Sequence, residues 1–445
     1  MTATCATLTR PELAERVLAS GARLGELPIA RLRPLVDEQL VALRQAGAST
    51  GSVVAVEEAG PQEFLASILA AWTLNAVPLP CKDASGTPLA DRAVTLVGTR
   101  ARPPAVSGEI GGLESTAVLH LTSGSTGDRK VARRGCDSVL NEAEGYRPGL
   151  ALGPEDRVYV PVPLAHSYGW GVALGALLAG CQLDVSPVVH ARRAVSRLEA
   201  ATVAALTAPI AGLFARTPGS RPPRGSAGGL RVAMVGASRV TAQLDDAFDA
   251  RFGLRLSRNY GSSETGATFI GGPGLADGAI GHPMPGVTVL GPQPGAEGEL
   301  RLVLPPVEGC LGCPDPPAQV WNTGDLVRRG EDGVVTFVAR VHETLRLNDR
   351  TVDVPRLQEV LRSISGVVDV FVLSAPRPDG TVEDLYAVVA GADVDRAQAE
   401  KCRPDFPDGA QSVRLVYTDR LPVSALGKPD RGHLIELVRA EWRRR

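Results

Sequence analysis

Short apolar runs separated by stretches with helical spacing dominate the first part of this chain. Val53–Val56 fits a buried strand, Pro61 opens a helical segment, and Val77–Leu79 fits a second strand. The apolar residues that recur on one helix face are Phe64, Leu65, Ile68, Leu69 and Trp72. This strand–helix–strand order predicts parallel units of an α/β fold, because parallel strands need a crossover connection.

Later apolar runs lead directly into polar loops. They are Val118–Leu121, Val158–Val162, Val203–Leu206 and Val232–Val235. In open α/β sheets, ligands bind at the carboxyl ends of the strands. We therefore look for the functional residues in these loops.

The pattern changes after about Gly291, where Glu299–Leu304 and Val334–Val338 fit strands of a β-rich piece. From Arg340 a smaller set of strands and helices follows. We predict an α/β protein with a large N-terminal domain of stacked α/β sheets plus a β-rich subdomain, residues 1–339. Residues 340–445 are predicted to form a small α+β C-terminal domain.

Charge and composition exclude several classes of protein. The formal net charge of the 445 residues is −2, which gives no global attraction to nucleic acid or to an anionic membrane. No segment approaches the roughly 20 apolar residues of a spanning helix. Charged residues interrupt the N-terminal segment, so it does not fit a signal peptide. We expect a cytoplasmic protein without nucleic-acid or membrane partners.

The cysteines indicate buried thiols and not a disulfide framework. There are seven, an odd number, and most are widely scattered. Cys310 and Cys313 form a C-x-x-C pair in a Gly/Pro-rich stretch. One such pair supplies half of the usual ligands of a structural zinc, so we favour a plain loop there.

The loop after Leu121 is rich in Ser, Gly and Thr and ends in a lysine. Its candidate residues are Thr122, Ser123, Gly124, Ser125, Thr126, Gly127 and Lys130. Glycines let successive N–H groups point at one anion, hydroxyls add donors and the lysine adds positive charge. Such a loop suits a triphosphate, although a Ser/Gly surface turn has the same composition, and the spacing is not that of a Walker motif.

Three further segments carry candidate groups, each of which alone also fits an ordinary polar turn. In Asn259–Glu264, Tyr260 and Gly261 offer a flat face for a purine, and Glu264 is an oxygen ligand suited to Mg²⁺. In Thr323–Asp325 a carboxylate could accept both hydroxyls of a ribose. In Leu421–Lys428 a lysine follows a glycine near the C-terminus.

Together, in this order and spacing, these motifs resemble the adenylate-forming superfamily: acyl- and aryl-CoA ligases, adenylation domains of peptide synthetases and firefly luciferase. The resemblance runs from about Val53 to Arg431. Further segments are similar to the family pattern, namely Pro163–His166, Gly281–Val287 and Gly298–Leu300.

The resemblance implies ATP and Mg²⁺ as cofactors and assigns a role to each motif. Thr122–Lys130 would cover the β- and γ-phosphates, Tyr260 and Gly261 would lie against adenine, and Ser263 would touch the α-phosphate. Glu264 would hold Mg²⁺, and Asp325 and Arg340 would bind the ribose. Lys428 would bridge the acid and the nucleotide from a mobile C-terminal domain whose hinge corresponds to His342. We count Lys428, Glu264 and His166 as the catalytic candidates.

The resemblance also places an acid pocket. Its candidate residues are Ser167, Tyr168, Gly236, Ala237 and Asn259, beside His166. Ser167 and Tyr168 are compatible with a ring substrate, so an aryl or arylacrylic acid is favoured over an aliphatic chain. Met234–Ser238 lacks the acidic residue that amino-acid-activating members usually have. The alternative is that His166 and Tyr168 only pack under the nucleotide.

Two departures from the family pattern concern the phosphate loop and the second half-reaction. Arg129 stands where the family has proline, and Asp349 stands where CoA ligases have a glycine beside the pantetheine. We expect the acyl group to pass to the thiol of CoA or of a carrier protein. The alternatives are an enzyme that uses a nitrogen nucleophile or nitrite, making an amide or diazo product, and a non-catalytic nucleotide-binding homologue.

Overall fold

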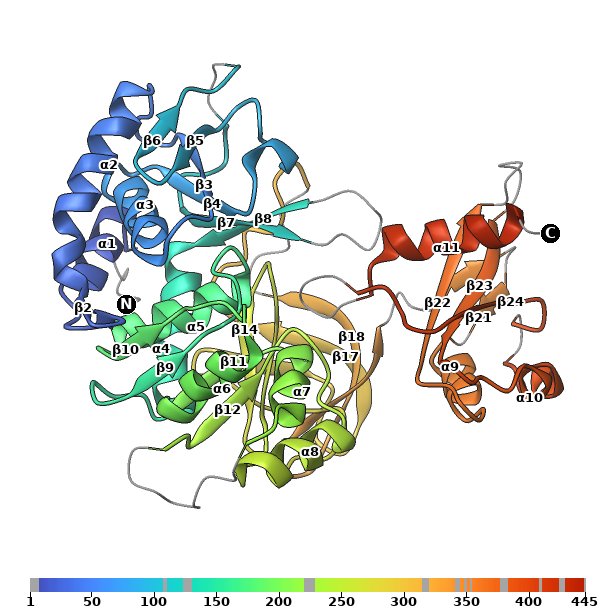
Figure 1. The fold of residues 1–445 in the computed structure, drawn as a ribbon. Helices are drawn as coiled ribbons and strands as arrows, with labels where there is room; N and C mark the ends of the chain where they lie inside the picture. Colours follow the sequence, from blue (N-terminus) through green and yellow to red (C-terminus); the bar gives the residue numbers. More distant parts are fainter. Residues whose placement is uncertain are drawn as a thin grey trace. The chain divides into compact units, whose positions relative to one another are not determined.

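Figure 1 shows the computed structural model, which describes residues 8–106, 110–122, 130–219, 229–313, 320–340, 345–347, 350–352, 354–376, 383–407, 410–423 and 429–443. The chain divides into two units. The larger holds residues 1–296, 301–322 and 329–336, and the smaller holds residues 297–300, 323–328 and 337–445. None of the described helices is long and apolar enough to cross a membrane.

The first apolar runs form a small sheet in the larger unit. Its strands are β3 (Val53–Glu57), β4 (Val77–Cys81), β5 (Val94–Val97) and β6 (Arg100–Arg102), in the order β4-β3-β5-β6. β3 is parallel to β4 and to β5, and α3 (Pro61–Thr73) connects β3 to β4. The predicted strand–helix–strand unit is therefore confirmed.

Helices and short elements surround this sheet. They are α1 (Arg10–Leu18), η1 (Ile29–Leu32), α2 (Arg33–Gln45) and η2 (Ala84–Gly86). The indole N–H of Trp72 on α3 donates to the carbonyl of Ala117 at 2.7 Å. This bond ties α3 to the hairpin of β7 (Thr116–Thr122) and β8 (Lys130–Gly135).

A second, larger sheet contains a parallel part. The strands, in spatial order, are β1 (Arg23–Leu24), β10 (Gln182–Asp184), β9 (Arg157–Tyr159), β11 (Val203–Leu206), β12 (Val232–Val235) and β13 (Ser257–Ser262). β2 (Leu27–Pro28) pairs antiparallel with β1 at the edge. The runs predicted at Val203 and Val232 are confirmed as neighbouring parallel strands.

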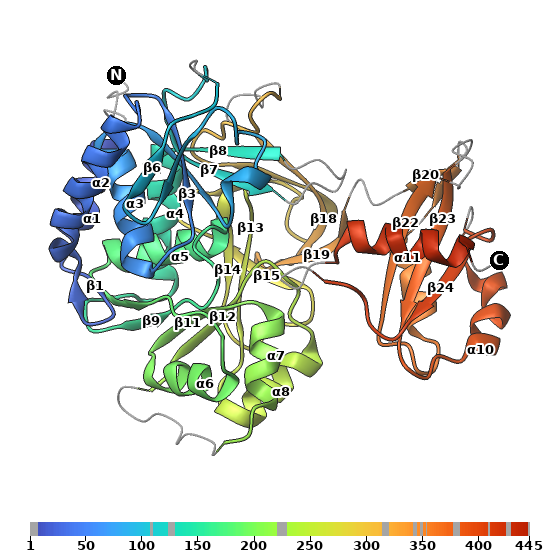
Figure 2. The same cartoon turned by 45° about the horizontal axis from the view of Figure 1, so that its top comes forward.

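Helices cover both faces of the parallel part, as Figure 2 shows from another side. On one face lie α6 (Ala191–Ala200), α7 (Ala208–Arg216) and α8 (Ala242–Phe252), which share a core with β11 and β12 through Leu198, Phe214 and Phe248. The other face carries α4 (Cys136–Gly149) and α5 (Ser167–Leu178). The α/β class expected from the sequence is thus confirmed.

The sheet continues with antiparallel strands after β13. These are β14 (Gly266–Gly271), β15 (Ala279–Pro283), β16 (Thr288–Gly291), β17 (Glu297–Val303), β18 (Trp321–Arg329) and β19 (Val335–Arg340). β13, β14 and β15 follow one another as antiparallel neighbours, and β15 pairs with β19. This is the β-rich piece expected near Gly291.

The smaller unit contains a three-stranded sheet in the order β22-β23-β24, with β22 (Asp369–Pro376), β23 (Glu383–Ala390) and β24 (Arg414–Thr418). Its other elements are β20 (Leu345–Leu347), β21 (Arg350–Val352), α9 (Val354–Arg362), α10 (Arg396–Lys401), η4 (Arg403–Asp405) and α11 (Arg431–Arg443). Leu357 and Phe406 belong to one core cluster of this unit, and Leu434 and Val438 belong to another.

Candidate functional site

The ends of the predicted phosphate loop are held by the β7–β8 hairpin. Thr122, the last residue of β7, pairs directly with Lys130, the first residue of β8. The intervening candidates Ser123, Gly124, Ser125, Thr126 and Gly127 lie outside the described residues. Lys130 itself is exposed at the start of β8, so its ammonium is accessible to an anion.

The second candidate segment lies on the β13–β14 hairpin. Its register shifts between Tyr260 and Gly261, which marks a β-bulge. A Cβ on Gly261 would come within 2.0 Å of the carbonyl oxygen of Gly266, so only glycine allows this close approach. The ring of Tyr260 packs edge-on against Phe269, with 5.7 Å between the centroids.

Reciprocal hydrogen bonds close the turn that carries Ser263 and Glu264. The N–H of Ser262 donates to Thr265 Oγ1 at 3.2 Å, and the N–H of Thr265 donates to Ser262 Oγ at 3.3 Å. Gly266 follows with a φ of +69°, a conformation that L side chains rarely adopt. The turn therefore presents Glu264, which is half-buried, from a defined backbone.

A buried ion pair stabilises this turn. Arg134 Nη2 lies 3.0 Å from Glu142 Oε2, and the other carboxylate oxygen accepts the N–H of Ala267 at 2.8 Å. The Arg134 guanidinium also donates to Ser138 Oγ at 3.0 Å. The pair thus joins β8, α4 and β14, and it fixes the phosphate-loop hairpin relative to the Glu264 hairpin.

A third segment, residues 309–311, lies beside the β7–β8 hairpin and carries Cys310 of the C-x-x-C pair. The N–H of Arg133 donates to the carbonyl of Gly309 at 2.8 Å, and the N–H of Leu311 donates to that of Val131 at 2.7 Å. Cys310 therefore lies beside β8, and its thiol donates to Glu264 Oε1 at 3.7 Å.

The surroundings of the Cys310 thiol shift its pKa. Burial raises this pKa to about 11, the negative charge of Glu264 adds to the shift, and Lys130 acts in the opposite direction. Glu264 and Lys130 are thus both near enough to influence one thiol. The C-x-x-C pair is visible in the sequence, but its position is not, since no local pattern indicates that residues 309–311 run beside β8.

His166 and Ser167 lie where α5 begins. His166 is the N-cap residue of α5, and its N–H donates to the carbonyl of Pro163 at 3.0 Å. Both residues are half-buried. A Cβ on Gly169 would come within 2.6 Å of the Pro163 carbonyl oxygen, so the helix packs tightly against the loop that precedes it.

Tyr168 and Gly236 are in direct contact. The Tyr168 hydroxyl donates to the carbonyl of Met234 at 3.1 Å, and a Cβ on Gly236 would lie 2.6 Å from the tyrosine ring. Burial raises the pKa of Tyr168, so the phenol stays neutral. The ring is buried and held at both its face and its hydroxyl.

Ala237 has a strained backbone at the carboxyl end of β12. Its φ of +60° lies in the left-handed region, which costs an L residue roughly 1–2 kcal/mol. Ser238 Oγ accepts the N–H of Ala208 at 3.0 Å and fixes the loop to the start of α7. Backbone strain of this kind is concentrated at functional sites, where the surrounding structure maintains it.

Asn259 is half-buried and bonded to α4. Its Oδ1 accepts the hydroxyl of Tyr146 at 3.0 Å. Tyr146 is fully buried. This bond sets the orientation of the Asn259 side chain next to the Tyr260 turn.

His120 is a buried residue near the site that the sequence reasoning missed. It lies on β7 and is 1% exposed, and both ring nitrogens are buried. Burial, and then the charges of Arg134 and His166, lower its pKa to about 3. A histidine within an apolar strand pattern gives no signal beyond its presence two residues before Thr122.

The remaining candidates belong to other parts of the chain. Asp325 groups with the smaller unit, is 2% exposed, and its N–H donates to Thr323 Oγ1 at 3.1 Å. Arg340 is the last residue of β19. Lys428, His342, Asp349 and Arg129 lie outside the described residues.

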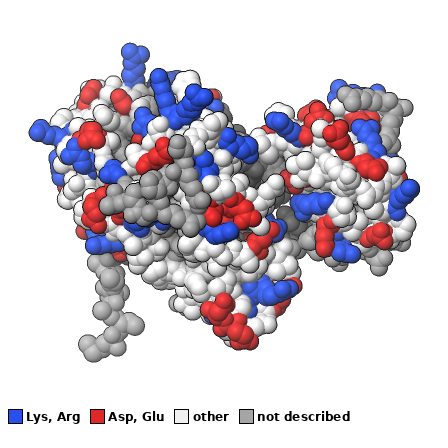
Figure 3. Space-filling model, turned by 60° about the horizontal axis from the view of Figure 1, so that its bottom comes forward, with Lys and Arg blue, Asp and Glu red and all other residues white. Residues whose placement is uncertain are grey.

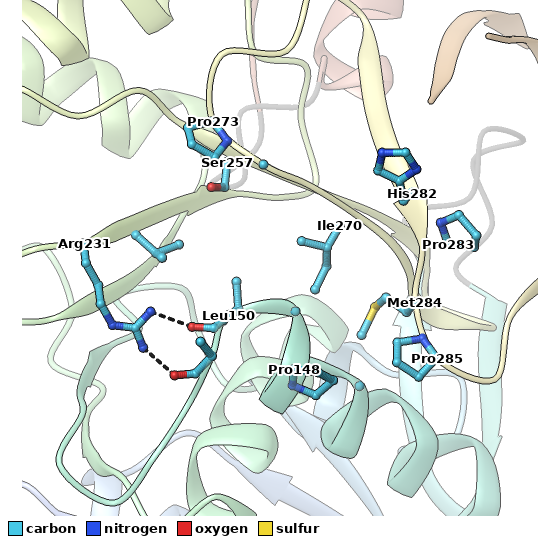
Figure 4. A pocket seen from close by; sticks show the side chains of 15 residues that line it. Pro148, Leu150, Arg231, Ser257, Ile270, Pro273, His282, Pro283, Met284 and Pro285 are labelled. Carbon is cyan, nitrogen blue, oxygen red and sulfur yellow. Dashed lines mark hydrogen bonds between the residues drawn. The ribbon is translucent and has the colours of Figure 1, made fainter. Parts of the chain in front are cut away.

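A cavity of about 400 Å³ lies between the end of α4 and strands β12 to β15 (Figure 4). Its arginine, Arg231, already donates to the carbonyls of Leu150 at 2.7 Å and Ala151 at 2.8 Å. None of the described candidate site residues lines this cavity.

The described surface mixes both signs of charge. On the face shown in Figure 3, basic and acidic side chains are interspersed over the atoms that are described. That distribution agrees with the formal net charge of −2.

Comparison with known proteins adds to this geometry. A family model described as AMP-binding enzyme matches residues 87–303. The chain is 33% identical over 239 residues to the probable nonribosomal peptide synthetase CymA of Salinispora arenicola, which covers 48% of this chain and 3% of that protein. It is 28% identical over 373 residues to the medium/long-chain-fatty-acid–[acyl-carrier-protein] ligase FadD10 of Mycobacterium tuberculosis, which covers 74% of this chain and 68% of that protein.

The fold has a close counterpart among solved structures. ATP-bound MatB from Rhodopseudomonas palustris superposes with a TM-score of 0.78 over 96% of this chain and 99% of that chain, at 20% identity. At this identity the similarity establishes the fold alone.

Proposed function

Because this chain belongs to the adenylate-forming superfamily, we propose that it activates a carboxylic acid with ATP, releases pyrophosphate, and transfers the acyl group to a thiol. The acid would be an aryl or arylacrylic acid. The thiol would belong to CoA or to the phosphopantetheine of a carrier protein. FadD10, whose acceptor is an acyl-carrier protein, supports a carrier protein as one such acceptor.

One observation carries this proposal. Residues 309–311 pair with β8, which begins at the exposed Lys130, and the Cys310 thiol of this segment donates to Glu264 Oε1 at 3.7 Å. The triphosphate needs positive charge and N–H donors, whereas a divalent cation needs oxygen ligands. The β7–β8 hairpin supplies the positive charge of Lys130, and the β13–β14 hairpin supplies the carboxylate oxygens of Glu264 at the same place.

The residues of the Glu264 turn suit Mg²⁺. Glu264 is half-buried on a closed turn, and a carboxylate oxygen is a hard ligand of the kind that Mg²⁺ prefers. Glu264 would hold the ion, which would neutralise charge on the phosphates when bound. Ser263 would contact the α-phosphate, and Tyr260 with Gly261 would lie against adenine.

Further roles rest on the family resemblance. Residues Ser123 to Gly127 would surround the β- and γ-phosphates, and Asp325 with Arg340 would bind the ribose hydroxyls. Lys428 would lie between the acid carboxylate and the α-phosphate. A cation at that position offsets the repulsion between two anions and stabilises the charge of the in-line transition state. His166 would lie at the boundary between nucleotide and acid.

The contact of Tyr168 with Gly236 supports a compact, flat substrate for the proposed acid pocket. The Tyr168 ring lies against Gly236, where no Cβ intervenes, and its hydroxyl is occupied by the Met234 carbonyl. A wall made of a fixed ring and bare backbone favours a planar ring over a flexible chain. Ala237 and Asn259 would complete the wall. An aliphatic acid, as the name of FadD10 gives for that relative, is the competing substrate.

A second candidate differs in the acceptor or in the oxyacid that is activated. Asp349 replaces the glycine that the family places beside the pantetheine thiol, and a carboxylate there opposes an anionic CoA. An amine, or nitrite as the activated oxyacid, would avoid that conflict. This observation favours an amide-forming or diazotising enzyme as the alternative.

ATP–pyrophosphate exchange across a panel of aryl, arylacrylic and aliphatic acids tests the first half-reaction. We expect exchange with an aryl or arylacrylic acid, and a loss on the order of 100- to 1000-fold in Lys428→Ala. Lys401→Ala, at an exposed position on α10, is the matched control and should retain exchange. Near-normal exchange in Lys428→Ala would remove the assignment of that residue.

Product analysis tests the second half-reaction. The enzyme with its best acid is supplied in turn with CoA, a phosphopantetheinyl carrier protein, amines and nitrite, and the products are identified by mass spectrometry. A thioester supports the lead proposal. An amide or diazo product with no thioester supports the alternative. Absence of exchange both with every acid and with nitrite supports the non-catalytic nucleotide-binding homologue.

A further inference from the structure

We propose that Cys310 and Cys313 are a modification site, at which a peroxide forms a reversible intramolecular disulfide that disables the Glu264 turn. The effect on activity rests on the proposed adenylation, whereas formation of the bond does not. The two cysteines lie in one turn next to a predicted Mg²⁺ ligand, and the mechanism above uses neither of them.

The turn brings the Cα atoms of the two cysteines into the range that disulfides span. The N–H of Cys313 donates to the carbonyl of Cys310 at 3.1 Å, and Gly312 has a φ of +75°. A positive φ at the third residue is the mark of a type II turn, in which the first and last Cα atoms are less than about 7 Å apart. Disulfides span Cα separations of roughly 4.4–6.8 Å. The backbone therefore needs little change to accommodate the bond.

The two thiols differ in access. Cys313 is exposed, and Cys310 is half-buried against the Glu264 turn. Among the other described cysteines, Cys81, Cys136 and Cys181 are buried. An oxidant in solvent therefore meets Cys313 before it meets those buried thiols, and Cys310 is the neighbouring thiol in the same turn.

The reaction balances with a peroxide as oxidant. Hydrogen peroxide oxidises the Cys313 thiol to a sulfenic acid and leaves one water. The Cys310 sulfur then attacks the Cys313 sulfur, the S–S bond forms, and the hydroxyl leaves with the Cys310 proton as a second water. The peroxide gains two electrons and the two thiols lose them. A dithiol in solution reverses the bond by exchange.

The disulfide would alter the site because the Cys310 sulfur cannot be bonded to Cys313 and still donate a hydrogen bond to Glu264. In the reduced protein its S–H donates to Glu264 Oε1 at 3.7 Å. In the disulfide that hydrogen is gone and the sulfur is drawn toward Cys313. The segment cannot move freely in compensation, because its N–H and carbonyl groups are bonded to β8 on both sides of Cys310. The Glu264 carboxylate loses its donor and changes position.

The test uses the full-length protein treated with graded hydrogen peroxide and then with an alkylating agent. Peptide mass spectrometry should find an internal cross-link in the peptide that contains both cysteines, two hydrogen atoms lighter than the reduced form. ATP–pyrophosphate exchange should fall roughly 10-fold or more, since small misplacements of a catalytic group are costly, and dithiothreitol should restore it.

Two variants make the result specific. Cys313→Ser should lack the cross-link and keep its exchange activity under peroxide. Cys402→Ser, in the other unit, should respond like the natural protein. Absence of the cross-link in the natural protein overturns the proposal, as does a cross-linked protein with unchanged exchange.

Failure of the proposed function is separable from failure of this site. If the reduced protein shows no exchange with any acid, Mg²⁺–ATP binding by the oxidised and reduced forms replaces exchange as the functional measurement. Weaker binding by the cross-linked form supports the site, and equal binding overturns it.

Discussion

Arg134 on β8 and Glu142 on α4 form an ion pair with 3.0 Å between Nη2 and Oε2, at side-chain exposures of 1% and 4%. Removing one partner of such a pair leaves a buried charge without compensation, which costs about 3–5 kcal/mol. We expect Glu142→Ala to lower the free energy of unfolding by that amount. Urea denaturation followed by circular dichroism measures it.

The matched control lies two residues further along the same helix. Glu144 pairs with Arg16 at 3.6 Å, with both side chains more than half exposed. Glu144→Ala should therefore cost less than about 1 kcal/mol. Equal destabilisation by the two variants would show that the buried pair contributes no more to the free energy of unfolding than the exposed pair.

Gly266 sets the geometry of the turn that carries Glu264. A Cβ there would lie 2.2 Å from Glu142 Oε2 and 2.4 Å from Arg134 Nη1, and its φ is +69°. Gly266→Ala should disturb the ion pair and the turn together and weaken Mg²⁺–ATP binding. A nucleotide titration monitored by calorimetry measures the affinity.

Gly272→Ala is the control for that substitution, because a Cβ at Gly272 meets nothing within 4 Å. It should bind Mg²⁺–ATP like the natural protein. Unchanged affinity of Gly266→Ala for Mg²⁺–ATP would show that this turn does not contribute to nucleotide binding.

Sequence pattern predicted the sheet well where a strand is buried on both faces. Val203–Leu206 and Val232–Val235 have the predicted bounds, because fully buried parallel strands are continuous apolar runs. The strand predicted at Val158–Val162 is shorter in the structure, where β9 ends at Tyr159. Pro161 and Pro163 follow, and proline has no N–H for a ladder bond.

The arrangement of the site could be predicted less completely. The motifs indicated the nucleotide chemistry of Lys130 and Glu264, but Cys310 reaches Glu264 only because residues 309–311 run beside β8. The contact of Tyr168 with Gly236 likewise joins α5 to the end of β12. Such contacts depend on the packing of distant elements, which local periodicity does not contain.

Asp156 should make stability depend on acid pH. Burial would raise the pKa of this carboxyl, but hydrogen bonds from Arg231, Thr202 and the N–H of Gly153 outweigh burial and lower it. A lowered pKa in the folded state means that the stabilisation is complete above the unfolded value, about 3.9, and is lost as pH falls through the folded value. Asp156→Asn should therefore cost about 2 kcal/mol at pH 7, and this difference should shrink below about pH 4.

The measurement is urea unfolding of both proteins from pH 7 down to acid pH. Asp277→Asn is the comparison, because its partner Arg239 is 60% exposed and such surface pairs contribute less than about 1 kcal/mol. A difference between Asp156→Asn and the natural protein that stays constant with pH would refute the titration of Asp156.

Tyr168 should limit the size of the acid. Its ring is buried against Gly236 and its hydroxyl donates to Met234 at 3.1 Å, so truncation opens space at the proposed acid pocket. Tyr168→Ala should shift the ratio of kcat/KM toward a two-ring aromatic acid over a one-ring acid, at a cost of about 3–5 kcal/mol in stability. Tyr168→Phe keeps the ring and loses one hydrogen bond, so it should cost about 1 kcal/mol and leave the ratio unchanged. Paired exchange assays with the two acids decide the matter. The same shift in both variants would mean that the hydroxyl, and not the volume of the ring, selects the substrate.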